Sequence, residues 1–292
     1  MRIKILLYLI LFFSFCIGHA EVKKNISFQS KILKRKMQYS VYLPDEYFTS
    51  PGKKFPVIYL LHGLNCNDSQ FLDFTEIDTI THNGIKNGDI PPVILIAPFV
   101  DKHKYYYMND HKNINLWEDM FVKEFIPYIE SKYRVKSSSK YRGITGISMG
   151  GYGALLHSLK YPDMYSACAA FSSGVRTDNQ IKNLDMTAYN YRYGNPLGMN
   201  LKGDKRLNKH YRNNDILTLA EVMPLAELSK TDYLIHCGDS DIFILGNTKL
   251  ASSFKNRGVK HTFTVEKGKH NWEYWKKHFW KGIKFIADKF KD

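Results

Sequence analysis

The sequence predicts an α/β fold in which helices cover both faces of a mostly parallel central sheet. Continuous apolar runs such as "FPVIYLLHG" (residues 55–63) and "PPVILIAP" (91–98) are typical of strands buried on both faces. These runs alternate with helical segments, as parallel strands joined by crossover helices require. With 44% hydrophobic and 14% aromatic residues among 292, the chain has enough apolar material for a packed core, which excludes a disordered protein.

The N-terminus has the pattern of an export signal. A basic start precedes an apolar run over residues 5–17, which is too short to span a bilayer comfortably. The run ends in the small-x-small cleavage site Gly18-His19-Ala20. We therefore expect a signal peptide over residues 1–20, cleaved after Ala20, and one mature domain over residues 21–292. A membrane anchor is the alternative.

The first elements of the mature chain are expected to be antiparallel. Residues 26–33 and 37–43 alternate as two strands, and Lys34-Arg35-Lys36 is the expected turn of their hairpin. Between the strands at 55–63 and 91–98, residues 69–82 are expected to form a helix that frays at "ITHNG".

The middle of the chain continues the alternation of helix and strand. Residues 115–133 carry apolar side chains at helical spacing, and Pro127 should bend that helix or mark an irregular turn in it. A short strand is expected at 141–147, followed by a helix at 150–160 that ends before Tyr161-Pro162-Asp163.

The second half supplies the remaining strands of the sheet. Strands are expected at 165–173, 232–238 and 260–268, with a helix at 246–256 between the last two. The final segment, 272–290, places its aromatic and aliphatic residues on one face, which predicts a helix packed on the core.

The stretch "GITGISMGGYGALL" follows one of these strands and begins a helix. It contains a G-x-S-x-G pattern centred on Ser148, in which small neighbours permit a sharp strand-to-helix turn that exposes the serine. An ordinary glycine-rich turn is the alternative, since the pattern alone arises by chance in about one chain in ten of this length. Ser148 would lie at the carboxyl end of its strand, where open α/β sheets bind ligands.

A serine nucleophile needs a base within hydrogen-bond reach and a third group that orients the base. In this fold class the chain order is serine, acid, histidine, on loops after successive strands. Asp241 follows the strand at 232–238, and His270 follows the strand at 260–268. Of the eleven histidines only His270 has this order and loop position, whereas Asp239 competes with Asp241 as the acid.

From "VYLPDEY" to the final helix, the chain resembles the esterase D family of α/β-hydrolases, which includes feruloyl esterases, tributyrin esterases and S-formylglutathione hydrolases. "KFPVIYLLHG" resembles the strand that leads to the family's oxyanion loop, and "GISMGGYGAL" resembles its serine turn. "CGDSD" resembles the G-x-x-D segment of secreted feruloyl esterases, whose last Asp is the catalytic acid, so it favours Asp241. "GKHNWEYW" resembles the family's G-x-H-x-W-x-x-W segment.

The resemblance implies an α/β-hydrolase fold with an insertion over the active site, and serine esterase chemistry by Ser148, Asp241 and His270. The backbone N–H groups of Leu64 and Met149 would form the oxyanion hole. Such acyl transfer needs no cofactor, and no C-x-x-C pair or clustered His/Cys spacing indicates a metal.

One segment departs from the feruloyl-esterase pattern. "HGLNCNDSQF" resembles S-formylglutathione hydrolases, with Cys66 at the position of their cysteine. An export signal argues against a glutathione thioester, which belongs in the cytosol. We favour a small buried residue beside the oxyanion loop at Cys66, with a reactive thiol as the alternative. The mature chain retains Cys66, Cys168 and Cys237, an odd number, and we expect Cys168 and Cys237 to be buried and inert.

The segment 174–229 interrupts the alternation and is the expected insertion. Its Tyr189, Tyr191 and Tyr193 are candidates to stack on a sugar or an aromatic acyl group, and Trp272 is a fourth candidate. The alternative is that the tyrosines pack the insertion itself. Four cations in the same segment are expected to be solvated rather than substrate-binding: Arg192, Lys202, Lys205 and Arg206.

The formal net charge of +14 becomes +12 when Arg2 and Lys4 leave with the signal. The lysines are spread along the chain and no nucleic-acid-binding motif is present, so a solvated basic surface is expected. We expect a small-molecule or oligosaccharide ester as partner, no nucleic acid, and no stable membrane insertion after signal cleavage. The sequence does not indicate an oligomeric state.

The preferred hypothesis is a secreted or periplasmic serine carboxylesterase that acts on feruloyl or acetyl esters of plant polysaccharide. An acyltransferase of the same fold, an S-formylglutathione hydrolase-like thioesterase and a non-catalytic carbohydrate-binding module are the alternatives. The complete set of Ser148, Asp241 and His270 argues against the module.

Overall fold

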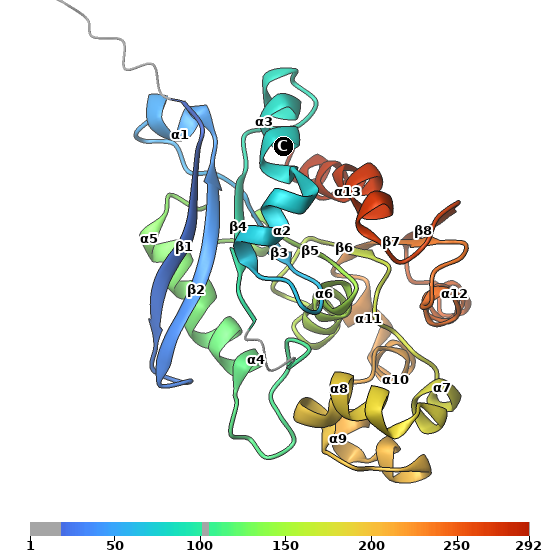
Figure 1. The fold of residues 1–292 in the computed structure, drawn as a ribbon. Coiled ribbons are helices and arrows are strands. Elements are labelled where there is room, and N and C mark those ends of the chain that lie inside the picture. The colour runs from blue at the N-terminus through green and yellow to red at the C-terminus, as the bar shows by residue number, and fades with distance from the viewer. Residues whose placement is uncertain (1–18, 101–104, 292) are drawn as a thin grey trace, which may run out of the picture.

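The computed structural model describes residues 19–100 and 105–291, which form one eight-stranded sheet of order β1-β2-β4-β3-β5-β6-β7-β8 (Figure 1). β1 pairs with β2 and β2 with β4 in antiparallel fashion, and the other neighbours are parallel. The predicted parallel sheet with an antiparallel N-terminal hairpin is therefore confirmed. The expected signal peptide lies almost entirely outside the described residues.

Every predicted strand is present, and all but β7, which has the predicted bounds, have shifted ends. The bounds are β1 Glu21–Ser30, β2 Arg35–Leu43, β3 Val57–Leu61, β4 Ile94–Pro98, β5 Arg142–Ile147, β6 Ala167–Phe171, β7 Asp232–Gly238 and β8 His261–Glu266.

The hairpin turn occupies residues 31–34, so the prediction that it spans Lys34-Arg35-Lys36 was wrong. Ser30 Oγ accepts a hydrogen bond from the Leu33 N–H at 2.9 Å, and the Glu124 carboxylate accepts one from the Lys31 N–H at 2.6 Å. These side chains accept hydrogen bonds from backbone N–H groups of the turn, beginning at its first residue. Lys34 is its last residue and has a φ of 53°.

The helices between the strands cover both faces of the sheet. Their bounds are α1 Asp45–Thr49, α2 Asp68–Thr75, α3 Ile77–Lys86, α4 Trp117–Met120, α5 Ile126–Lys132, α6 Met149–Lys160, α12 Ile244–Asn256 and α13 Trp272–Ala287.

The helix predicted over residues 69–82 is two helices, because Glu76 between α2 and α3 adopts the left-handed conformation with φ of 51°. The segment "ITHNG" is helical within α3 instead of frayed. A Cβ on Gly84 would lie 2.2 Å from the Trp280 ring, so this glycine lets α3 pack closely against α13.

The helix predicted over residues 115–133 contains the expected irregularity near Pro127. α4 and α5 are joined by a π-helical turn, Phe121–Phe125, in which the Ile126 N–H donates to the Phe121 carbonyl. Pro127 has no N–H to donate, so it is tolerated at the start of α5.

Alternate residues of the central strand β3 enter the two halves of the core. Val57, Tyr59 and Leu61 belong to the half of the core that also contains residues of α4, α5, α6 and α12, whereas Ile58 and Leu60 belong to the half with residues of α2, α3 and α13. The predicted helices on both faces are confirmed, and burial of every β3 side chain accounts for its continuous apolar sequence.

The insertion, residues 174–229, is wholly helical in its regular structure. It comprises α7 Asp178–Asn183, α8 Met186–Leu197, a 3-10 turn Gly203–Leu207, α9 Lys209–Arg212, α10 Ile216–Val222 and α11 Leu225–Leu228. Figure 1 shows α7 to α10 grouped together, well away from the β1–β2 hairpin.

Arg206 holds the insertion together from within. Its side chain is 2% exposed and donates to the carbonyls of Leu201, Ile181 and Leu184 at 2.6–2.9 Å. The expectation that Arg206 is a solvated cation was therefore wrong, because three inward-facing carbonyls need a donor.

Within residues 19–100 and 105–291, no helix has both the length and the apolar character that crossing a membrane requires.

Candidate active site

Ser148 occupies a strained turn between β5 and α6. Its φ of 55° and ψ of −115° lie in a region that residues with a side chain rarely adopt. The turn is held by the end of β6: the Ser148 N–H donates to the Phe171 carbonyl, and the Gly174 N–H donates to the Ser148 carbonyl, each at 2.9 Å. The hydroxyl is thus presented at the carboxyl end of the sheet.

The glycines beside Ser148 are required by close backbone packing. A Cβ on Gly150 would lie 1.9 Å from the Leu61 carbonyl oxygen at the end of β3. One on Gly146 would lie 2.5 Å from the backbone of Gly150. Both positions exclude any side chain, which gives a physical reason for the G-x-S-x-G spacing.

The structure brings together the three residues predicted from chain order. Ser148 Oγ lies 2.8 Å from His270 Nε2, and His270 Nδ1 lies 3.0 Å from each carboxylate oxygen of Asp241. An imidazole that donates its Nδ1–H to Asp241 accepts the Ser148 O–H at Nε2. The rival Asp239 is exposed and accepts the Gly268 N–H at 3.1 Å instead.

Asp241 is buried and is held as a carboxylate. Burial by itself favours the neutral acid, but the hydrogen bond and positive charge of His270 oppose it. The Phe243 N–H, which donates to Oδ1 at 2.8 Å, also favours the ionised carboxylate, and so does the Ser172 hydroxyl. Together they place the pKa of Asp241 below its usual value.

Two aromatic rings fix the His270 ring. Phe243 and Trp275 contact it with ring centroids 5.0 and 4.8 Å away, and the Trp275 ring is perpendicular to it. The Trp275 indole N–H also donates to Ser172 Oγ at 2.9 Å. On Phe243 lies the guanidinium of Arg176, 4.6 Å from the ring centroid.

Sequence reasoning did not assign site roles to Phe243, Ser172, Arg176 or Trp275. Phe243 and Trp275 had a usable signal, since they lie two and five residues after Asp241 and His270. Ser172 and Arg176 come from the end of β6, and only the fold brings them to the site.

The loop after β3 is fixed by His62. Its buried imidazole accepts the Val100 N–H at Nε2 (3.0 Å), and its Nδ1–H donates to the Gly63 carbonyl (2.8 Å). Burial lowers the pKa of His62 to about 4, so the ring stays neutral and can keep both roles. A Cβ on Gly63 would lie 3.7 Å from Ser148 Cβ, which places this loop beside the serine.

The predicted oxyanion donors lie on the two segments that meet here. Leu64 follows Gly63, and Met149 is the first residue of α6. Neither backbone N–H donates a hydrogen bond to any other group in the described part of the chain. Both are therefore available to an oxygen bound next to Ser148.

Of the three tyrosines predicted to contact substrate, the structure buries two and exposes one. Tyr189 is fully buried under the Arg206 guanidinium, and Tyr193 is buried against Tyr106, which favours packing roles for both. Tyr191 is 47% exposed, and its hydroxyl donates to Asn65 Oδ1 at 2.9 Å. Tyr191 thus connects the insertion to the residue that follows Leu64.

Trp272 contacts Trp275, which in turn contacts the His270 ring. Its indole contacts Phe74, with centroids 4.8 Å apart, and it meets Trp275 edge-on at 5.2 Å. Trp275, the residue that touches His270, is the nearer aromatic.

The three cysteines of the described chain, Cys66, Cys168 and Cys237, are free and buried. Burial raises the pKa of Cys66 and of Cys168 to about 12, and raises that of Cys237 further. Thiols held protonated in this way are poor nucleophiles. This agrees with the expectation of inert cysteines.

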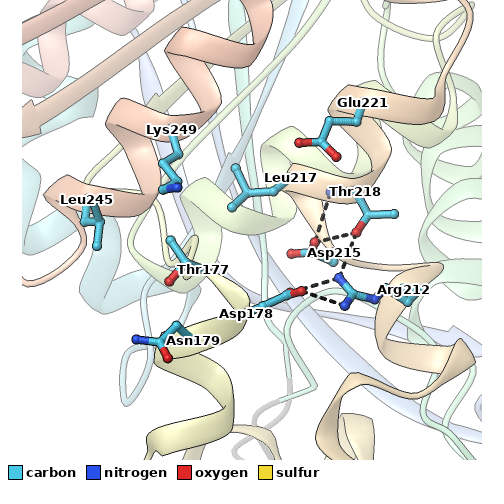
Figure 2. Close-up of a pocket in the computed structure, with 10 residues that line it drawn as sticks. All are labelled: Thr177, Asp178, Asn179, Arg212, Asp215, Leu217, Thr218, Glu221, Leu245 and Lys249. Carbon is cyan, nitrogen blue, oxygen red and sulfur yellow. Dashed lines mark hydrogen bonds and ion pairs between the residues drawn. The ribbon is translucent and has the colours of Figure 1, made fainter. Parts of the chain in front are cut away.

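A separate hollow of about 490 Å³ lies between α7, α10 and α12 (Figure 2). Arg212 pairs there with both carboxylate oxygens of Asp178 at 2.6 and 2.9 Å. Asp215 accepts from both the N–H and the hydroxyl of Thr218. Because these polar groups satisfy one another and the hollow contains no member of the predicted catalytic set, it is not the candidate active site.

A serine on a strained strand-to-helix turn, facing a histidine and an acid from later loops of a mostly parallel sheet, defines the class of α/β-hydrolase-fold serine hydrolases. A family model described as putative esterase matches residues 30–286, and the chain belongs to that family.

Several curated relatives are named as esterases. An acetyl esterase of Caldicellulosiruptor saccharolyticus is 24% identical over 90% of this chain and 97% of its own length. An endo-1,4-beta-xylanase/feruloyl esterase of Xylanibacter ruminicola is 26% identical over 59% of this chain, which corresponds to 24% of that larger protein.

Solved structures agree with the fold. A ferulic acid esterase superposes with a TM-score of 0.79 at 25% identity, covering 93% of this chain and all of its own. An S-formylglutathione hydrolase of Staphylococcus aureus superposes with a TM-score of 0.73 at 20% identity, covering 92% of this chain and 99% of its own, which supports the fold alone. The predictions of family, fold and carboxylic ester hydrolase activity are confirmed.

Proposed function

We propose that this chain is an exported carboxylesterase in which Ser148 is the nucleophile, His270 the general base and Asp241 the orienting acid. The observation that carries the proposal is the hydrogen-bonded series from Ser148 Oγ through His270 to Asp241, with contacts of 2.8 and 3.0 Å. Each member follows a different parallel strand, so all three meet at one edge of the sheet.

In the acylation step, the Ser148 oxygen attacks the ester carbonyl carbon while its proton passes to His270 Nε2. The ionised Asp241 stabilises the resulting imidazolium through Nδ1–H. The carbonyl oxygen gains negative charge and accepts the N–H groups of Leu64 and Met149, and loss of one such donor typically costs about 10²–10³ in rate.

In the second half of the reaction, the imidazolium of His270 protonates the leaving alcohol oxygen, and the acyl group stays on Ser148. Water then gives a proton to His270 and attacks the acyl carbon, which releases the free acid and restores the serine. These steps use only protein groups and water.

For the substrate we propose acetyl or feruloyl esters on plant polysaccharide, as the names of the acetyl esterase and feruloyl esterase relatives suggest. The exposed ring of Tyr191 beside Asn65 and the indole of Trp272 are the aromatic surfaces proposed to contact sugar or aryl groups. Burial of the Cys66 thiol gives no support to a reactive role for that cysteine.

Export to the periplasm or the exterior remains our proposal for location. The signal pattern over residues 1–20 supports it, and β1 begins at Glu21, directly after the proposed cleavage point. Mass measurement of the N-terminal peptide of the protein recovered from its native compartment tests cleavage after Ala20.

The substrate proposal is tested by hydrolysis of a matched panel: p-nitrophenyl acetate and butyrate, methyl ferulate, and acetylated and feruloylated xylo-oligosaccharides. We expect the xylo-oligosaccharide esters to have the highest kcat/KM. Turnover of only the activated short esters would reject the polysaccharide substrate. Formation of a new ester with an added alcohol, in place of free acid, would indicate the acyltransferase alternative.

A further inference from the structure

Three potential metal ligands from separate elements converge on the α13 face of the sheet. They are His236 of β7, Glu266 of β8 and His278 of α13, and their ligand atoms all lie within 4.8 Å of one another. His236 Nε2 lies 3.5 Å from Glu266 Oε1, and His278 Nδ1 lies 3.4 Å from Glu266 Oε2.

The two histidine nitrogens lack ordinary partners. The His236 and His278 side chains are 0% and 2% exposed, and within the described chain neither His236 Nε2 nor His278 Nδ1 makes a hydrogen bond. A buried polar atom without a partner costs free energy, and most such atoms in folded proteins have a protein, water or ion partner. Both nitrogens point to the same carboxylate.

The separations fit a metal ion better than hydrogen bonds. Ligand atoms bound to tetrahedral zinc at about 2.0–2.1 Å lie roughly 3.4 Å from one another. The nitrogen–oxygen distances of 3.4 and 3.5 Å, which run to the two different oxygens of Glu266, are close to that spacing, whereas a good N–H···O bond is shorter.

A neighbouring tyrosine orients the His236 imidazole for metal binding. His236 Nδ1 lies 2.8 Å from the Tyr274 hydroxyl, so an Nδ1–H that donates to Tyr274 leaves the Nε2 lone pair facing Glu266. Ligating histidines commonly donate their second ring N–H to such a partner.

An ion can reach these groups from solvent. The Glu266 side chain is 34% exposed, and His278 borders a surface hollow of about 420 Å³ between the loop after β8 and α13. The ammonium of Lys281 pairs with Glu266 and competes with a cation, and this side chain is 47% exposed.

We propose that His236, Glu266 and His278 bind one divalent transition-metal ion, with Zn²⁺ favoured by two imidazoles and a carboxylate and with water as the fourth ligand. The ion joins β7, β8 and α13. The loops that follow β7 and β8 carry Asp241 and His270, so the metal stabilises the edge of the sheet that positions them and takes no part in ester chemistry. The ligands are widely spaced along the chain, which is why no sequence motif indicates them.

Zinc binding to the full mature protein tests the proposal directly. Chelator-treated protein is dialysed against Zn²⁺, and the zinc bound per chain is measured by elemental mass spectrometry. Thermal unfolding is then followed with and without the ion. We expect one equivalent of zinc and a melting temperature higher by several degrees. His278→Ala and Glu266→Gln should lose both effects, whereas His261→Ala, a change of a histidine elsewhere on β8, should keep them.

Lys281→Met provides a gain-of-binding variant at an exposed position, so it does not depend on a variant that may be destabilised. Removal of the competing ammonium should tighten zinc binding at least several-fold. The proposal would be overturned if the protein bound no zinc, or if His278→Ala bound zinc as well as the wild type does. It would also be overturned if only His270→Ala lost zinc binding. Because the readouts are metal content and melting temperature, they are independent of whether the proposed ester chemistry holds.

Discussion

Asp239 and Asp241 lie on one loop, and their different surroundings assign them different tasks. Asp241 is buried and accepts the His270 Nδ1–H, whereas Asp239 is exposed and accepts the Gly268 N–H. Order along the chain leaves both residues open as the acid. The G-x-x-D resemblance favoured Asp241, and the contact with His270 now supports that choice.

At the residue scale, Asp241→Asn should lower kcat by about 10⁴-fold, since the amide removes the charge and permits the wrong imidazole tautomer. Asp239→Asn should change kcat by less than about tenfold, because the Asp239 carboxylate accepts from the Gly268 N–H and the Ser240 hydroxyl and not from His270 in the described part of the chain. Steady-state hydrolysis of p-nitrophenyl acetate by both variants is the measurement. Equal losses in the two variants would contradict the assignment.

Ser148, Asp241 and His270 were predictable because α/β-hydrolase chemistry fixes their order and their places after strands. Ser172 and Arg176 were not, since they act through contacts that only the packing of β6 against β7 creates. The internal role of Arg206 also escaped prediction. A sequence does not tell a solvated cation from one that satisfies buried carbonyls.

At the element scale, the nucleophile turn depends on the contact between α6 and β3. Gly150→Ala would place a Cβ 1.9 Å from the Leu61 carbonyl oxygen, so the turn must shift. We expect esterase activity to fall at least about 10²-fold, because small displacements of positioned groups are costly.

Gly52→Ala is the matched control, since nothing lies within 4 Å of its added Cβ and its backbone needs no positive φ. Activity and unfolding temperature of both variants are compared. Full activity in Gly150→Ala would show that the turn is not constrained as described.

The helical insertion should depend on Arg206. Arg206→Ala leaves three buried carbonyls without their charged donor, and we expect a loss of about 3 kcal/mol or more in the free energy of unfolding. Lys205→Ala, at the exposed neighbouring position, should change it by less than about 0.5 kcal/mol. Urea unfolding measures both, and similar values for the two would refute the role of Arg206.

The strands were the most predictable elements, because residues buried on both faces leave long apolar runs. The helix over 69–82 was mispredicted as one unit since a single left-handed residue, Glu76, divides it. Nothing in the local sequence requires that conformation of a glutamate. Likewise, the hairpin turn moved because Glu124, distant in the chain, binds its N–H groups.

For the whole molecule, buried histidines such as His62 and His157 should make stability depend on pH. Burial lowers the pKa of His62 and of His157 to about 4 in the folded protein, against about 6.5 in an unfolded chain. Below about pH 6.5 the unfolded chain binds protons that the folded protein does not, so stability is complete above that pH and falls towards pH 4.

We therefore expect the free energy of unfolding to decrease between about pH 6.5 and 5, where most carboxylates remain ionised, by up to about 2 kcal/mol per histidine. Urea unfolding at several pH values measures the slope, and His157→Gln should reduce it. A free energy that stays constant over this window would show that the two rings are not held neutral.

The sheet and its covering helices could be predicted from hydrophobic periodicity and from the family resemblance. The contacts between side chains that are distant in the sequence were only partly predictable. β7 and β8 place Asp241 and His270 beside Ser148, and with α13 they also bring His236, Glu266 and His278 into one cluster. The first set matches a known order of residues, whereas the second has no sequence pattern and required the fold.

The central claim, that Ser148 carries the acyl group, is tested most directly by covalent labelling. The mature protein is treated with a fluorophosphonate ester, and the adduct is located by intact-mass and peptide mass spectrometry. We predict one adduct per chain, on the peptide that contains Ser148, and none in Ser148→Ala, with Ser158→Ala on the same helix labelled as the wild type. An adduct that persists in Ser148→Ala, or that maps to another residue, would contradict the account.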